Sequence, residues 1–143
     1  VAFSNTISGV VMTLCSTTSE HSMEHAMSAY HSNLPHGAGL IMISKAYFTF
    51  FIKKGCCPER YIKMAQLLGM KEAKEPMDFI TALCNLQKEC GVDDLKMSDY
   101  GIKEDELRKI AVNAKETMGG LFLADRYQLT ENDCVEIYKE SYK

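Results

Sequence analysis

The chain has 143 residues, of which 46% are hydrophobic and 24% are charged, and its formal net charge is −3. This length and this apolar share are typical of one folded domain and exclude a disordered tail. The basic residues are scattered and no apolar run is long enough to cross a bilayer. We therefore expect neither nucleic acid nor a membrane as a partner.

The cysteines and methionines favour a reducing compartment. Cys56 and Cys57 are adjacent and lack the C-x-x-C spacing of a zinc knuckle or a redox site. Four other cysteines stand singly in amphipathic stretches, where we expect small buried side chains: Cys15, Cys84, Cys90 and Cys134. With nine methionines beside six thiols and no signal-peptide pattern, the predicted location is the cytoplasm.

The first stretch, residues 1–14, is rich in apolar and small side chains and is predicted to form a buried helix. A polar run over residues 16–19 follows it. Ser19 is expected to cap the next helix, because its hydroxyl can accept a hydrogen bond from a free N–H group of the first turn.

Residues 20–39 hold all four histidines of the chain. His21 and His25 are four positions apart, so in a helix their side chains lie on one face. Pro35 lacks an N–H group and should end that helix, with His36 at the start of the next one. We therefore predict a helix, a tight bend and a second helix, with His36 brought back towards the His21 face. Neutral imidazole is the commonest protein ligand for zinc and iron, so the cluster predicts a metal site.

Residues 40–51 are almost entirely apolar, with Lys45 as the one charged side chain, which is typical of a core helix. Pro58 and Pro76 are expected to open two further helices.

An amphipathic run over residues 102–119 predicts another helix, and Thr130 with Asp133 has the spacing of a capping box for the last one. No alternating strand pattern competes with these helices. The predicted fold is all-α, a single domain over residues 1–143 built as a bundle of roughly six to eight helices.

Two functions can be drawn from the histidine spacing alone. The run H-S-M-E-H fits H-x-x-E-H, so a zinc hydrolase could use His21 and His25 as ligands and Glu24 to activate water. The second is a non-catalytic helical interaction module, in which the histidines form a passive surface.

A wider resemblance covers residues 2–142. A-F-S-N near the start, H-S-M-E-H-A-M-S-A-Y, L-P-H-G-A-G-L, and a tail that begins M-G-G-L-F-L-A-D-R-Y resemble the iron-containing (group III) alcohol dehydrogenases. In that family a G-x-x-H-x-x-x-H helix precedes a P-H-G turn; here Thr18 replaces the glycine. The resemblance implies that His21 and His36 are metal ligands and that His25 is catalytic, as a proton relay or a substrate contact. It gives His31 no role, and we expect that side chain to face solvent.

The same resemblance implies that the chain is the C-terminal, metal-binding domain of a two-domain, dehydroquinate synthase-like enzyme. The family's N-terminal dinucleotide-binding domain and its D-x-x-x-H ligands have no counterpart here, because no aspartate has a histidine four residues later and no glycine-rich phosphate loop follows a strand. The implied function is an NAD- or NADP-dependent alcohol dehydrogenase that uses Fe(II), or Zn(II), on small alcohols and aldehydes. The chain alone is expected to be inactive. A homodimer is one possible form of assembly.

Overall fold

The computed structural model describes residues 1–143 as seven α-helices and three short 3-10 helices, without strands. The α-helices are α1 (Ala2–Cys15), α2 (Ser19–Tyr30), α3 (His36–Lys53), α4 (Pro58–Leu67), α5 (Asp78–Glu89), α6 (Leu107–Met118) and α7 (Glu131–Ser141). The 3-10 helices are η1 (Met97–Tyr100), η2 (Glu104–Glu106) and η3 (Gly119–Ala124). The predicted all-α bundle is confirmed. None of these helices combines the length and the apolar character that crossing a bilayer requires.

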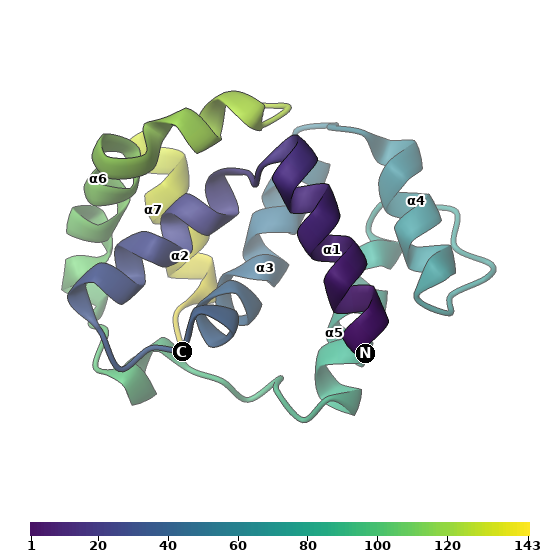
Figure 1. The fold of residues 1–143 in the computed structure, drawn as a ribbon, viewed down its shortest axis with the longest axis horizontal. Helices are drawn as coiled ribbons and strands as arrows, with labels where there is room; N and C mark the ends of the chain where they lie inside the picture. The colour runs from purple at the N-terminus through teal and green to yellow at the C-terminus, as the bar shows by residue number, and fades with distance from the viewer.

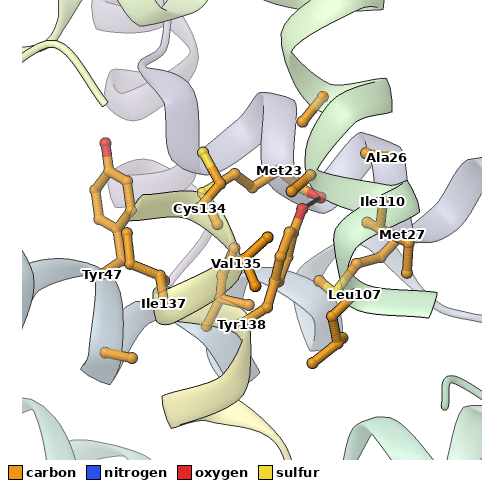
Figure 2. Close-up of a cluster of buried hydrophobic side chains, with 14 of the residues drawn as sticks. Met23, Ala26, Met27, Tyr47, Leu107, Ile110, Cys134, Val135, Ile137 and Tyr138 are labelled. Atoms are coloured by element: carbon orange, nitrogen blue, oxygen red, sulfur yellow. Dashed lines mark hydrogen bonds between the residues drawn. The ribbon is translucent and has the colours of Figure 1, made fainter. Parts of the chain in front are cut away.

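The main core lies among α2, α3, α6 and α7, which pack against one another in Figure 1. Figure 2 shows Tyr138 of α7 reaching across this core to α2, where its hydroxyl donates a hydrogen bond of 2.7 Å to the carbonyl oxygen of Met23. Burial raises the pKa of Tyr138 well above the usual value of a phenol. A buried hydroxyl without an acceptor would cost about 1–3 kcal/mol, so this bond fixes how α7 sits against α2.

A smaller core joins α4 and α5 to α3. Phe79 is buried in it, and the Phe48 ring of α3 packs edge-on against Phe79 at 5.3 Å between centroids. The predicted core helix over residues 40–51 is confirmed, since α3 packs Phe48 against the smaller core and buries one long face in the main core: Met42, Ile43, Ala46, Tyr47, Phe50 and Phe51. Helix α3 is therefore the element to which both parts of the molecule are attached.

The local signals for helix ends are largely confirmed. Pro58 is the first residue of α4, and Thr130 with Asp133 forms the predicted capping box of α7. Helix α5 begins two residues after Pro76, and the helix predicted to start at residue 102 begins at Leu107 behind the single turn η2.

Predictions about burial or capping are wrong for α1, for two of the cysteines and for Ser19. No residue of α1 is buried, and Phe3 and Leu14 are each 78% exposed. The sequence does predict the helix, but its apolar side chains stay exposed because no other helix packs closely against α1. Cys15 and Cys90 are also exposed, whereas Cys134 is buried as expected. Ser19 is the first helical residue rather than the cap, and its hydroxyl pairs with the Tyr47 hydroxyl at 3.0 Å.

Candidate metal centre

The site is built where the chain reverses between α2 and α3. Leu34 is buried beneath the bend, and its N–H group donates to the carbonyl of His31 at 2.9 Å. Pro35 occupies the N-cap position of α3 in an extended conformation, with φ −65° and ψ 135°. His36 is therefore the first residue of α3, and the predicted helix, bend and helix are confirmed.

Three imidazole rings meet at this reversal. The rings of His25 and His36 stack with centroids 4.9 Å apart and planes inclined by 28°. The ring of His21 lies 5.3 Å from that of His36. The bend thus returns His36 to the face of α2 that carries His21 and His25, as expected from the spacing.

The electrostatics of the cluster favour neutral imidazole at His21. Burial lowers the pKa of His21, and the neighbouring imidazoles of His36 and His25 lower it further, against an opposing contribution from the Glu24 carboxylate. A neutral ring keeps a lone pair, which is the form that binds a metal ion.

Glu24 is part of this cluster and is completely buried. One carboxylate oxygen contacts Nδ1 of His36, and the other accepts a hydrogen bond from the hydroxyl of Ser28. Sequence reasoning considered Glu24 only as the base of a hydrolase. The sequence did indicate that Glu24 lies near the histidines, because it is three residues after His21 and directly precedes His25 in the same helix.

The donor atoms of Glu24, His25 and His36 lie within 4.8 Å of one another, a spacing that one metal ion could bridge. The donors of His21 lie outside that group although its ring adjoins His36. Imidazole nitrogen and carboxylate oxygen together suit a divalent ion such as Fe(II) or Zn(II).

A polar network supports the first turn of α2, just before His21. Oδ1 of Asp125 accepts hydrogen bonds from the N–H of Ser19 at 3.3 Å and from the Tyr47 hydroxyl at 3.1 Å. The pKa of Glu20 is raised to about 8, chiefly by burial and further by the charge of Asp125. Asp125 therefore replaces the local cap predicted at Ser19.

His31, expected to face solvent, does not. Its side chain is only 14% exposed, and Nε2 lies 3.4 Å from a carboxylate oxygen of Glu106. The expectation is wrong because the turn at η2 covers the end of α2, a contact between residues far apart in the sequence. His31 does not join the other three histidines.

A family model described as the Fe-containing alcohol dehydrogenase family, C-terminal, matches residues 1–142. An archaeal halo-thermophilic alcohol dehydrogenase from a Red Sea brine pool, bound to NZQ, superposes with a TM-score of 0.79 at 25% identity, over 88% of this chain and 33% of its own. A 1,3-propanediol oxidoreductase superposes with a TM-score of 0.75 at 19% identity, over 89% of this chain and 33% of its own, which is a likeness of fold alone. The chain thus spans about a third of the length of these solved relatives. A comparison with curated proteins gave no match.

Proposed function

The chain belongs to the Fe-containing alcohol dehydrogenase family, and we propose that it forms the metal-binding part of an NAD(P)-dependent enzyme that interconverts alcohols with aldehydes or ketones. The observation that carries this proposal is the convergence of His21, His25 and His36 at the reversal between α2 and α3.

In this proposal His21 and His36 hold the metal ion, Fe(II) or Zn(II). Both present imidazole rings on one side of the bend, and the lowered pKa of His21 keeps its lone pair free at neutral pH. When bound, such an ion supplies Lewis-acid stabilisation to the oxygen of the alcohol. Two imidazoles from one chain bind an ion weakly, so further ligands are expected from the rest of the enzyme.

His25 is proposed to move the proton of the substrate hydroxyl. Its side chain is exposed while its ring is stacked on His36, so it stands next to the metal ligand and open to a small substrate. An imidazole is suited to this task because its ordinary pKa lies near neutrality.

The nicotinamide cofactor, NAD or NADP, is proposed to bind on a separate dinucleotide-binding domain of the same enzyme. Support comes from the share of the solved relatives that this chain covers, 33% of their length. The isolated chain is accordingly expected to have no dehydrogenase turnover. We further propose a cytoplasmic enzyme, with a homodimer as one form of assembly.

The burial of Glu24 argues against the hydrolase hypothesis. A base that activates water needs an oxygen that the water can reach, whereas Glu24 is wholly buried and both of its oxygens already accept from other groups. No observation favours the non-catalytic interaction module over the metal centre.

The test is metal analysis and titration of this chain, and of the chain joined to the preceding part of its enzyme. We expect weak Fe(II) or Zn(II) binding by the chain and tight binding by the longer protein, lost in a His21→Ala, His36→Ala double variant. A matched His31→Ala variant should bind like the native protein. Equal uptake by the native and double-variant proteins would refute the proposal.

A further inference from the structure

Glu24 is an acidic side chain in an unusual place. It lies in the middle of α2, faces the core and is 0% exposed. An ionised carboxylate is buried at a cost of several kcal/mol unless other groups hydrogen-bond to it. Here each oxygen has a partner: Ser28 donates to Oε1, and Nδ1 of His36 contacts Oε2. Because both oxygens have partners, the Glu24–His36 pair is a specific polar contact between α2 and α3.

The contact determines which nitrogen of His36 carries the proton. A carboxylate only accepts hydrogen bonds, so we assign the hydrogen to the Nδ1 atom of His36 that faces Glu24. In a neutral imidazole with a proton on Nδ1, the lone pair is on Nε2. The His36 side chain is 48% exposed. Since Nδ1 faces a buried group, the exposed edge of the ring is the one that carries Nε2.

Gly39 provides the space for this carboxylate. A Cβ atom at position 39 would lie 2.6 Å from Cγ and 2.9 Å from Oε1 of Glu24, closer than real Cβ atoms come. Because Glu24 is fully buried, a Cβ atom at position 39 would push its carboxylate away from the place beside His36 that it occupies. Gly37, in the same first turn of α3, is a natural control because a Cβ there would meet nothing within 4 Å.

We propose that Glu24 is a positioning residue that holds His36 with its proton on Nδ1 and its Nε2 lone pair directed at the metal, and that Gly39 is glycine to admit this carboxylate. The inference rests on the proposed function, in which His36 is a metal ligand. The Glu24 oxygens lie close enough to the donors of His25 and His36 to share an ion, but Ser28 and His36 engage both of them, so we assign Glu24 a role through His36 and not as a ligand. Such partners of ligating histidines typically contribute about 10–100-fold to metal affinity.

The first test measures the tautomer without any metal. A two-bond ¹⁵N–¹H correlation spectrum of the ¹⁵N-histidine-labelled chain, recorded at a pH where imidazoles are neutral, separates protonated from unprotonated ring nitrogens. We expect His36 to carry its proton on Nδ1 in the native chain and to become a mixture of tautomers in Glu24→Ala. An unchanged His36 signal in that variant would overturn the proposal.

The second test measures affinity for Co(II), a spectroscopically visible substitute for Fe(II) or Zn(II). Glu24→Ala and Gly39→Ala should each weaken binding by about 10–100-fold, whereas Gly37→Ala should bind like the native chain. Glu24→Gln should recover most of the loss, because its amide oxygen still accepts from Nδ1–H. Equal affinities for Gly39→Ala and Gly37→Ala would overturn the role of Gly39.

The two tests separate the inference from the proposed function. If neither this chain nor the longer enzyme binds Co(II), the proposed function fails, and the spectra alone decide whether Glu24 sets the tautomer of His36. If Glu24→Ala does not fold by circular dichroism, Gly39→Ala carries the comparison, since it displaces the carboxylate without removing it. A native tautomer in a folded Gly39→Ala chain would then count against the proposal.

Discussion

The backbone N–H of Ser19, at the first residue of α2, donates a hydrogen bond to Oδ1 of Asp125 at 3.3 Å across 106 positions of sequence. The same oxygen accepts from the Tyr47 hydroxyl at 3.1 Å. A side chain from the end of η3 therefore caps the helix that carries His21 and His25, and ties it to α3. A negative charge at this end also interacts favourably with the helix dipole.

Replacing Asp125 with alanine should lower the free energy of unfolding by about 1–2 kcal/mol, because the first turn of α2 loses its acceptor. Urea denaturation followed by circular dichroism measures the change. Asp125→Asn should lose less, since its amide oxygen can still accept, and the exposed Asp94→Ala is the matched control. Equal unfolding free energies for Asp125→Ala and Asp94→Ala would contradict the capping role.

The raised pKa of Glu20 should make the stability of the metal-free chain depend on pH. Its pKa is raised from an ordinary value of 4.5 to about 8, chiefly by burial and then by Asp125. Between these two values the folded chain binds more protons than the unfolded chain, so the unfolding free energy should fall as pH rises from about 4.5 to 8. Glu20→Gln, which cannot ionise, should flatten this slope. Urea midpoints measured across that range in the presence of EDTA test it, and parallel slopes for both proteins would refute it.

Tyr138→Phe should lower the free energy of unfolding by about 1 kcal/mol, because the hydrogen bond to the Met23 carbonyl is lost while the ring stays in the core. Tyr138→Ala should cost about 3–5 kcal/mol, since a buried cavity opens as well. Tyr30→Phe serves as the control, because Tyr30 is 40% exposed. If thermal unfolding gives Tyr138→Phe and Tyr30→Phe the same melting temperature, the hydrogen bond from Tyr138 to Met23 contributes little to stability.

Removing residues 1–15 should change the free energy of unfolding by less than about 1 kcal/mol, because α1 contributes no buried side chain to either core. The shortened chain should also self-associate less in analytical ultracentrifugation, since exposed apolar residues such as Phe3 and Leu14 are gone. A large fall in the melting temperature would mean that α1 packs on the bundle.

The parts of the fold that sequence reasoning predicted correctly depend on short-range signals. Pro35 is the N-cap of α3 because its ring restricts its immediate neighbours, and Thr130 with Asp133 caps α7 within one turn. The same logic brought His36 to the face of His21, since only a tight bend separates their helices. The all-α fold followed from such signals added along the chain.

The wrong predictions concern contacts between residues that are far apart in the sequence. His31 was expected in solvent, but η2 brings Glu106 to its side chain, and the capping of α2 came from Asp125 rather than from Ser19. The pattern of residues 1–14 predicted an apolar helix correctly, yet a pattern does not say whether another helix covers it.

Local sequence signals predict the helices, the bend and the approach of three histidines, because backbone sterics and helical spacing act over a few residues. The packing of the helices, in contrast, places Glu24 against His36 rather than in water, leaves room for it at Gly39 and brings Asp125 to the start of α2. Those contacts depend on how closely two helices approach and on which side chain is buried between them, and neither quantity is encoded in local spacing.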